Sequence, residues 1–442
     1  MNTRHHTTET ALELVNTQGS LLLGHCTSRS LRLTRYADPS LEKDDRNGYL
    51  SRVVSATSPA NEPQRHEDGI NSWKRWLTAT ARPEHQIHAK LEARLLINMG
   101  GTVLENAGLQ LDRFGTAYLP GSAVKACARR TALATLRQWC ETGVKPSAAD
   151  SDAIADACAH PDFKTPSDLL LAILRVFGCT TLEWQGYDRE KNKGNDLAWA
   201  CADADQWKTL SLAARAQLPS DTLRGSVAFL PAFPHSRPDE DLELDVLTSH
   251  HPDYYSQTKD PRGNLKQPTA TDTEDPRPVY FPAIAAGAIY TYAVLPLGQP
   301  DDKLLAHAKT WLKVGIETFG VGAKTAAGYG YFSDQTSATN TELLHQQAAA
   351  QLAAARTTLT PDAKLLGELK TKKPDQLRGL INGFAVDAKF WTAKDESFQL
   401  TLLHFATSED PTLYDAEKAN PKSKIIAGLR NLAAKFNRPL PT

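Results

Sequence analysis

The residues best suited to binding chemistry lie in one glycine-rich stretch, residues 319–332, which reads FGVGAKTAAGYGYF. Its candidate ligand-binding residues are Gly320, Gly322, Lys324, Thr325, Gly328 and Tyr329. Glycine allows backbone turns with positive φ and lets another molecule approach the chain closely. Successive N–H groups in such a loop, with a lysine beside them, bind phosphate or another polyanion. A helix cap followed by a turn explains the same residues, and the loop alone does not decide between these readings.

The order of elements around this loop excludes two familiar nucleotide sites. In a phosphate-binding P-loop a strand precedes the loop, a helix follows it, and glycine stands directly before the lysine. Here a helical pattern precedes the loop and Ala323 stands before Lys324. The third glycine of a dinucleotide-binding fingerprint would fall on Thr325. ATP binding through this loop is therefore the weakest hypothesis.

A second candidate site lies at the start of a predicted helix, residues 122–139. Ser122 is placed to cap the helix. Lys125 and Arg129, four positions apart, share one face near the end that carries the positive dipole charge. These groups together could hold a phosphate. An ordinary amphipathic helix with a solvated basic face explains the same residues, and taken alone they favour that interpretation.

Other reactive side chains give no clear site. His250 and His251 follow a predicted strand, but no carboxylate or thiolate stands at a spacing typical of metal ligands. We therefore expect no metal and no cofactor. The six cysteines form no C-x-x-C pair, which favours a reduced protein. They are Cys26, Cys127, Cys140, Cys158, Cys179 and Cys201.

The composition limits the partners of the chain. Its 442 residues allow one large domain with insertions or two domains. The net charge of −1 gives no overall basic field, so a nucleic-acid surface must be a local patch. No apolar run approaches the roughly 20 residues that span a bilayer. The start, MNTRHHTTET, lacks the apolar core of a secretory signal, so we expect a cytoplasmic protein without membrane contact.

The hydrophobic periodicity predicts the elements that must position these groups. Helices are expected at residues 71–80, 122–139, 168–177 and 301–318. Strands are expected at residues 85–98, 224–231 and 241–248, and within 278–297. Polar stretches predict loops or insertions at about 38–70, 185–199 and 256–278, and a linker at 333–340. From residue 341 to 442 the pattern is mainly helical.

Three separated stretches resemble the RAMP superfamily of CRISPR proteins. They are GGTVLENAGLQLDRFGTAYLPGSAVKACARR, LELDVLTSHHPDYY and GVGAKTAAGYGYF. The first is similar to a family motif P-G-S-S-[LI]-K-G-x-x-R, and the last to G-x-G-x-K-T-A-A-G-Y-G. The middle stretch, similar to D-V-x-x-x-H-x-x-Y-Y, favours the family of sixth RAMP subunits of type III-B (Cmr) effector complexes. The resemblance covers roughly residues 85–332, whereas residues 1–84 and 341–442 match loosely.

The resemblance implies an α+β fold with a ferredoxin-like (RRM-like) core over residues 85–334. Residues 1–84 would be an N-terminal extension, and residues 341–442 a mainly helical C-terminal one. It also implies a non-catalytic structural subunit that binds the crRNA near its 3′ end in a ribonucleoprotein of antiviral defence. The implied partners are the crRNA, through it the target RNA, and other RAMP subunits. Implied RNA contacts are Arg113, Ser122, Lys125, Arg129, Gly320, Gly322, Lys324, Thr325, Gly328 and Tyr329.

The chain departs from the family motifs in ways that bear on its activity. The second serine and the glycine of the helix motif are Ala123 and Ala126 here. Catalytic RAMP subunits carry an aspartate shortly before the position matched to Arg113, and the nearby acids here, Glu105 and Asp112, do not match it clearly. A metal-dependent ribonuclease acting on target RNA or guide precursor is therefore the alternative. A histidine general base is a further enzymatic option, with candidates His85, His88, His250 and His251.

Overall fold

The computed structural model divides the chain into two compact units, Met1–Thr336 and Ser337–Thr442. The structure describes residues 29–34, 43–55, 62–98, 100, 109–146, 162–184, 195–201, 203–236, 241–358, 360–386 and 388–440. Residues 185–194 of the loop or insertion expected at 185–199 lie outside these ranges, as do Glu105, Cys26 and Cys158. The end of that stretch is a short helix, Asp196–Trp199, because the Asn195 side chain caps it by accepting from the Ala198 N–H.

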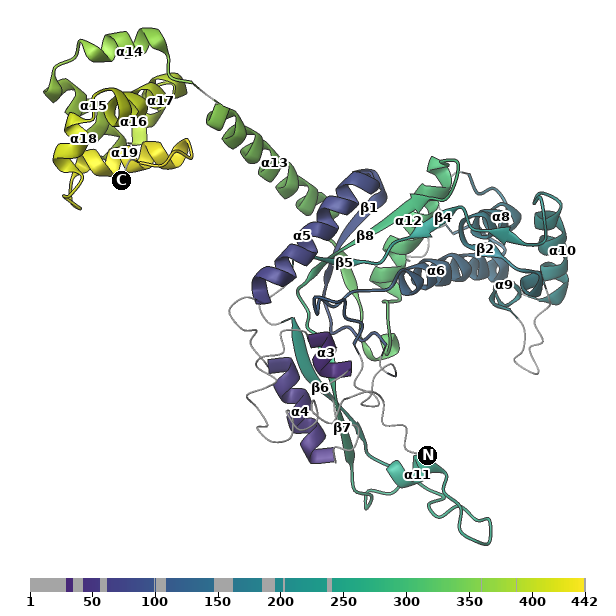
Figure 1. Ribbon diagram of the computed structural model, residues 1–442. Coiled ribbons are helices and arrows are strands. Elements are labelled where there is room, and N and C mark those ends of the chain that lie inside the picture. Colours follow the sequence, from purple (N-terminus) through teal and green to yellow (C-terminus); the bar gives the residue numbers. More distant parts are fainter. Residues whose placement is uncertain are drawn as a thin grey trace. The chain divides into compact units, whose positions relative to one another are not determined.

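An antiparallel sheet forms the centre of the first unit (Figure 1). Its strands are β1 (Gln86–Leu91), β4 (Val227–Phe229), β5 (Phe233–Ser236), β8 (Ile289–Pro296) and β9 (Phe332–Asp334). The order is β4-β8-β1-β9, and β5 also pairs with β8. Ile87 stands opposite Tyr292, and Leu91 opposite Phe332. The two central strands, β1 and β8, therefore join parts of the chain that are far apart in sequence.

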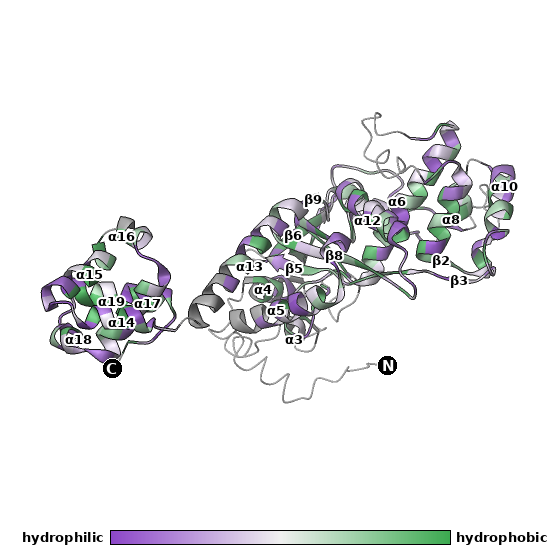
Figure 2. Ribbon diagram, turned by 90° about the horizontal axis from the view of Figure 1, so that it is seen from above, coloured by the Kyte–Doolittle hydropathy of each residue, from purple (hydrophilic) through white to green (hydrophobic). Residues whose placement is uncertain are grey.

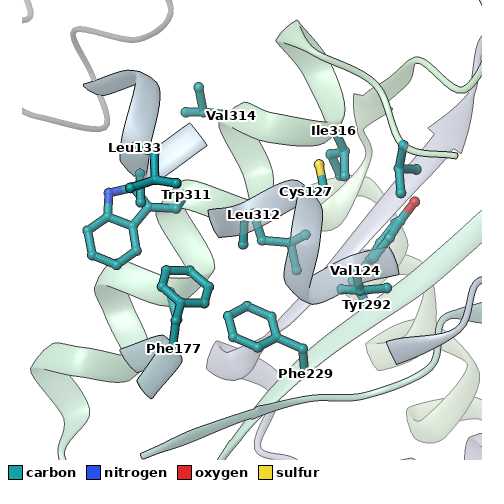
Figure 3. Packing of buried hydrophobic residues seen from close by; sticks show 14 of the residues in the cluster. Val124, Cys127, Leu133, Phe177, Phe229, Tyr292, Trp311, Leu312, Val314 and Ile316 are labelled. Atoms are coloured by element: carbon teal, nitrogen blue, oxygen red, sulfur yellow. The ribbon is translucent and has the colours of Figure 1, made fainter. Parts of the chain in front are cut away.

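Two helices, α6 (Gly121–Thr142) and α12 (Asp302–Thr318), pack against each other and against this sheet. The core between them includes Val124, Leu312 and Tyr292, all completely buried. Figure 3 shows this packing, with α8 (Pro166–Phe177) contributing Phe177 beside Trp311. The neighbouring Ala293 of β8 packs instead with Leu77 of α5 (Glu62–Thr80), because successive strand residues point to opposite faces.

Local sequence explains where these helices begin and end. Asp301 caps α12 by accepting hydrogen bonds from the N–H groups of Lys303 and Leu304, both at 3.1 Å. Thr165 and Asp168 form a capping box at the start of α8. Both helices confirm the sequence-based predictions. Smaller elements beside α8 are β2 (Gly178–Cys179), η2 (Thr181–Trp184), α9 (Asp196–Trp199), α10 (Ala204–Arg215) and β3 (Leu223–Arg224).

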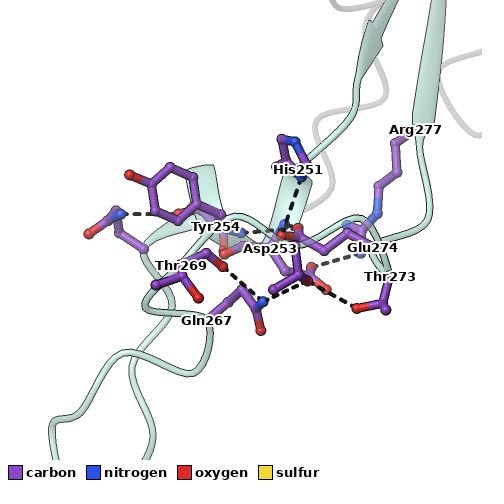
Figure 4. A network of polar contacts seen from close by, with 11 residues as sticks. His251, Asp253, Tyr254, Gln267, Thr269, Thr273, Glu274 and Arg277 are labelled. Atoms are coloured by element: carbon purple, nitrogen blue, oxygen red, sulfur yellow. Dashed lines mark hydrogen bonds and ion pairs between the residues drawn. The ribbon is translucent and has the colours of Figure 1, made fainter.

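A long two-stranded arm of β6 (Leu242–Ser249) and β7 (Arg277–Ile284) extends from the sheet region (Figure 1). Its outer end holds α11 (Pro252–Ser256) and the segment at residues 257–276. Figure 4 shows that polar contacts organise this end: Glu274 accepts hydrogen bonds from the N–H groups of Asp253 and Tyr254, and Asp253 pairs with Arg277 at 3.1 Å. The predicted loop is thus held by side chains.

Two predicted connections contain regular secondary structure. Helices α3 (Arg29–Thr34) and α4 (Lys43–Ser55) lie in the N-terminal region, and α4 and α5 cover most of the loop or insertion expected at 38–70, so the loop alternative is wrong there. Buried Tyr49, Leu50 and Val53 let α4 pack on the arm despite its polar composition. The linker expected at 333–340 is β9 followed by α13 (Thr336–Thr358), because the strand pairs with β1 and Asp334 accepts from the Thr336 N–H at 2.9 Å.

The second unit is helical and has its own hydrophobic core. After α13 its helices are α14 (Ala363–Lys370), α15 (Pro374–Val386), α16 (Ala388–Ala393), α17 (Glu396–His404), η4 (Phe405–Glu409), α18 (Thr412–Glu417) and α19 (Lys424–Lys435). Hydrophobic and hydrophilic residues alternate along these helices (Figure 2), and the apolar ones meet around Phe384, Leu429 and Phe436. In the described part of the chain no helix combines the length and apolar character needed to cross a bilayer.

Helices α15 and α19 cross closely at Gly428. A Cβ built there would lie less than 3.0 Å from the carbonyl oxygen of Ile381. We expect Gly428→Ala to destabilise the second unit by about 2 kcal/mol, since forced overpacking costs about 1–3 kcal/mol. Trp391 packs on this core and reports its unfolding. In a chain whose other seven tryptophans are replaced by phenylalanine, its fluorescence measures the denaturant midpoint of the second unit. Gly379→Ala, with nothing within 4 Å of its Cβ, is the matched control; equal midpoints would contradict the crossing.

Candidate nucleic-acid interface

The glycine-rich loop follows α12 directly and is closed by its own backbone. Gly320, which follows the helix C-cap residue, has a φ of 69°, as expected for a helix-ending glycine. The N–H of Val321 donates to the carbonyl of Gly330 at 2.9 Å, and the N–H of Gly330 donates to that of Arg94 at 2.7 Å. The N–H of Ala323 donates to Leu96 at 2.8 Å. The loop is therefore fastened to the chain that follows β1.

Several N–H groups of the loop remain available to a ligand. Those of Gly322, Lys324, Thr325 and Ala326 donate no hydrogen bond within the described part of the chain. Lys324 itself adopts a left-handed backbone with a φ of 56°, which is uncommon for a residue other than glycine. This arrangement presents free donors beside a lysine, as the sequence predicts for an anion-binding loop.

The start of α6 differs from its prediction. The helix begins at Gly121, and Pro120 occupies the N-cap position, so Ser122 lies inside the first turn and does not cap the helix. The carbonyl of Pro120 accepts from the N–H groups of Ala123 and Val124 at 2.9 and 3.1 Å. A Cβ at Gly121 would lie 2.5 Å from the Phe229 carbonyl oxygen, which explains the glycine. The first N–H groups of the helix still lack intrahelical acceptors.

The loop and α6 line one cavity of about 510 Å³. Ala123, Ala126, Cys127 and Arg130 line it from one face of α6, at intervals of three, four and seven residues. The remaining lining residues are Ile97, Asn98, Gln110, Pro120, Gly320, Val321, Gly322, Ala323 and Thr325. The structure therefore brings together the two stretches that sequence singled out separately.

Two cations of these stretches make no ion pair in the described chain: Arg130 lines the cavity, whereas Lys324 belongs to the loop but is not among the lining residues. Lys324 lies with Nζ 4.9 Å from the ring centre of Phe281. The guanidinium of Arg130 lies 4.8 Å above the ring of Phe319. The sequence analysis did not identify Arg130 as a site residue. Helical spacing could have identified it, because Arg130 shares a helix face with Ala123 and Ala126, whereas Lys125 and Arg129 lie on a different face.

Lys125 and Arg129 make structural contacts on that other side of α6. Lys125 Nζ donates to the carbonyl of Phe177, at the end of α8, at 2.8 Å, and burial together with the charge of Arg129 lowers the pKa of the Lys125 ammonium. Arg129 donates to Glu183 at 2.6 Å and to Asp196 at 2.8 and 2.9 Å. Neither residue lines the cavity. Their RNA contacts stay predictions, and the observed partners favour a structural role.

Tyr329 links the loop to the root of the arm. Its hydroxyl donates to a carboxylate oxygen of Asp245, and Arg94 pairs with the same carboxylate at 3.2 Å and with Glu243 at 2.6 Å. Burial and then the bond to Asp245 raise the pKa of the Tyr329 hydroxyl. The ring packs with the cluster of Leu96, Phe281 and Ala283. Tyr329 therefore packs within the protein, and its RNA contact stays a prediction.

Arg113 sits on an exposed turn, with its guanidinium 4.6 Å from the Phe114 ring centre. Asp112 holds that turn, because its carboxylate accepts from the N–H groups of Phe114 and Thr116, both at 2.8 Å. Burial raises the pKa of Asp112 despite these bonds. The carboxylate proposed for metal-dependent cleavage is thus already engaged in local structure.

Other candidate reactive groups do not assemble a site within the described ranges. No cluster of three or more histidine, cysteine or acidic side chains is arranged to hold a metal there. His88 is 2% exposed and its Nδ1 lies 3.0 Å from the Thr291 hydroxyl. His251 lies 3.7 Å from Glu274 at the end of the arm. Burial raises the pKa of the Cys127 thiol to about 12, so the thiol in the cavity wall stays protonated at neutral pH.

An antiparallel sheet with two helices packed against it, and a glycine-rich loop between the second helix and the last strand, defines the class of protein. The chain belongs to the RAMP superfamily, whose family model matches residues 88–333. This match confirms the resemblance seen in the three motifs. Helices α14–α19 lie beyond the matched region.

Among individual proteins, the chain is similar to the CRISPR system Cmr subunit Cmr6 of Pyrococcus furiosus, with 26% identity over 255 residues. This alignment covers 54% of the chain and 65% of that relative's length. The crystal structure of that Cmr6 matches with a TM-score of 0.26 and 20% identity, covering 56% of this chain and 97% of the other. A chain of the type III-B Cmr-beta complex bound to cognate target RNA matches with a TM-score of 0.36 and 15% identity, covering 73% and 84%.

Proposed function

We propose that the chain is a non-catalytic subunit of a type III-B CRISPR effector complex that binds the crRNA near its 3′ end. The observation that carries this proposal is that the free N–H groups of Gly322 and Thr325 and the side chain of Arg130 line one cavity beside the start of α6, with Lys324 in the same loop. Backbone N–H groups bind phosphates without reading sequence. A guide complex needs such tolerance, because base pairing supplies its specificity.

The family and the relative support the type of assembly. The chain is a RAMP protein, and the similar protein Cmr6 is a subunit of the Cmr CRISPR system. We propose as partners the crRNA, the target RNA that pairs with it and other RAMP subunits, in the cytoplasm. Of the ten residues predicted from the motifs, Gly320, Gly322 and Thr325 line the cavity. We propose these three, with Arg113, Ser122, Lys324 and Gly328 outside the lining, as RNA contacts, and the others, Lys125, Arg129 and Tyr329, as structural residues.

We also propose that the sheet with α6 and α12 is a ferredoxin-like core, flanked by the N-terminal extension at 1–84 and the helical extension at 341–442. The strand order β4-β8-β1-β9, with α6 following β1 and α12 joining β8 to β9, supports this arrangement. The arm of β6 and β7 is then an insertion between the second and third strands of the core.

The first test is co-expression of the tagged chain with the other CRISPR subunits of its host. We expect to recover a multi-subunit particle that holds RNAs of uniform length. In a separate assay, the purified chain alone should leave RNA intact when Mg²⁺ or Mn²⁺ is added. Recovery of a lone, RNA-free protein would contradict the proposal. Cleavage by the chain alone that disappears in Asp112→Ala would favour the ribonuclease alternative.

The RNA contacts are tested with the double variant Lys324→Ala, Arg130→Ala. We expect the affinity of the full chain for single-stranded RNA to fall about tenfold, and the salt dependence of binding to decrease, because two phosphate-facing charges are lost. The control is Lys208→Ala, Arg224→Ala, which removes the same charge from exposed positions away from the cavity. An equal effect of both double variants would show that only net charge matters.

A further inference from the structure

The cavity beside the glycine loop is larger than phosphate binding requires. Its volume of about 510 Å³ falls within the range of roughly 300–1,000 Å³ that holds whole small organic molecules. Of the free N–H groups that we assign to phosphate, those of Gly322 and Thr325 belong to residues of one cavity wall. The rest of its volume lies against α6 and the chain after β1, and remains to be explained.

The side chains that line the cavity suit a flat, neutral group better than a second charge. Ala123, Ala126 and Ile97 give it apolar walls, together with Val321 and Ala323. No acidic side chain lines it, and its single charged side chain is that of Arg130. A nucleobase has apolar faces and a polar edge, which these walls match.

Two amide side chains also line the cavity, Asn98 and Gln110. Gln110 Nε2 donates to the Tyr118 hydroxyl at 2.7 Å, and its Oε1 accepts no hydrogen bond within the described chain. Asn98 is exposed and is held in a left-handed backbone with a φ of 64°. Amides both donate and accept hydrogen bonds, so they can pair with the edge of a base. Single-stranded RNA is commonly recognised through unstacked bases that are bonded in this way.

We propose that this cavity takes one unstacked base of single-stranded RNA, while an adjoining phosphate lies on the free N–H groups of the glycine loop. This inference rests on the proposed RNA-binding function and adds to it the component of RNA that enters the protein. The apolar walls hold the faces of the base, and Asn98 and Gln110 meet its edge. Arg130 lies at the same cavity and neutralises the backbone there.

The test fills the cavity without removing any proposed phosphate contact. Ala126 is exposed within α6, and leucine is a good helix former, so Ala126→Leu is expected to fold. Two probes are titrated into the full chain: a short single-stranded RNA and an abasic ribose-phosphate oligomer of the same length. For the wild-type chain we expect the abasic oligomer to bind about tenfold more weakly. Ala126→Leu should bind RNA about tenfold more weakly than wild type, with an unchanged salt dependence and no further loss on the abasic oligomer.

The matched control is Ala213→Leu, the same change at an exposed alanine of α10; it should bind RNA as the wild type does. Equal RNA affinity of wild type and Ala126→Leu would overturn the base site and leave the proposed function intact. A loss of equal size on RNA and on the abasic oligomer would show that the cavity serves the backbone alone. Absence of RNA binding by the wild-type chain would instead contradict the proposed function.

Discussion

Replacing Gly330 with alanine is expected to destabilise the first unit by on the order of 3 kcal/mol. The residue has a φ of 73°, and a Cβ there would lie less than 3.0 Å from the carbonyl oxygen of Val321. A left-handed backbone costs a non-glycine residue about 1–2 kcal/mol, and overpacking adds about 1–3 kcal/mol. The clash falls on Val321, the residue whose N–H also donates to the Gly330 carbonyl to close the loop.

The loop contains its own control, Gly328. Its φ is 94°, but a Cβ there would meet nothing within 4 Å, so Gly328→Ala isolates the backbone cost of about 1–2 kcal/mol. Seven of the eight tryptophans lie in the first unit, so fluorescence in a Trp391→Phe background reports its unfolding midpoint. If the two alanine variants unfolded at the same denaturant concentration, the close approach of Gly330 to Val321 would be refuted.

Arg129→Ala is expected to cost about 2–3 kcal/mol of stability while leaving RNA affinity and its salt dependence unchanged. The arginine is 16% exposed and lies between Glu183 and Asp196, whose side chains are 23% and 48% exposed. Breaking a fully buried ion pair costs about 3–5 kcal/mol, and the partial exposure of Asp196 reduces this value. The measurements are the denaturant midpoint and an RNA titration at several salt concentrations.

A surface pair provides the comparison. Arg82 lies 3.6 Å from Glu84, with side chains 63% and 58% exposed, and Arg82→Ala should shift the denaturant midpoint far less than Arg129→Ala does. Arg129→Lys should recover part of the loss, because lysine keeps the charge but not the planar, two-point contact. A fall in RNA affinity with little change in stability would instead support the phosphate contact that the motif predicts for Arg129.

The sequence allowed prediction of those features that short-range signals determine. Periodic apolar residues and the Asp301 cap identify α12, and Thr165 with Asp168 marks the start of α8. The sequence does not predict helix α4, because only a few of its residues are apolar and the rest are polar. The sequence places the N-cap of α6 at Ser122, because serine is a common cap residue, but the helix begins at Gly121 and its N-cap is Pro120.

The candidate site also combines features that local sequence predicts with features that only tertiary packing determines. Sequence located the glycine loop and the start of α6, and their meeting at one cavity follows from packing that no local pattern encodes. Lys125 and Arg129 are already hydrogen-bonded within the protein. Their partners are Phe177, Glu183 and Asp196, about 50 to 70 positions further along the chain. Tertiary contacts therefore decide which basic residues of α6 line the cavity, and Arg130 is the one that lines it.

The pairing of β1 with β8 also governs when the protein can fold during synthesis. Ile87 meets Tyr292 across about 200 intervening positions, so the central sheet cannot close until β8 has left the ribosome. Contacts of such long separation slow folding, because loop closure must precede the favourable interactions. The arm of β6 and β7 is local and can form earlier, and the second unit has its own core and can fold afterwards. During translation β1 stays without its sheet partners until β8 and β9 have been made, so its apolar residues are exposed to aggregation for that time.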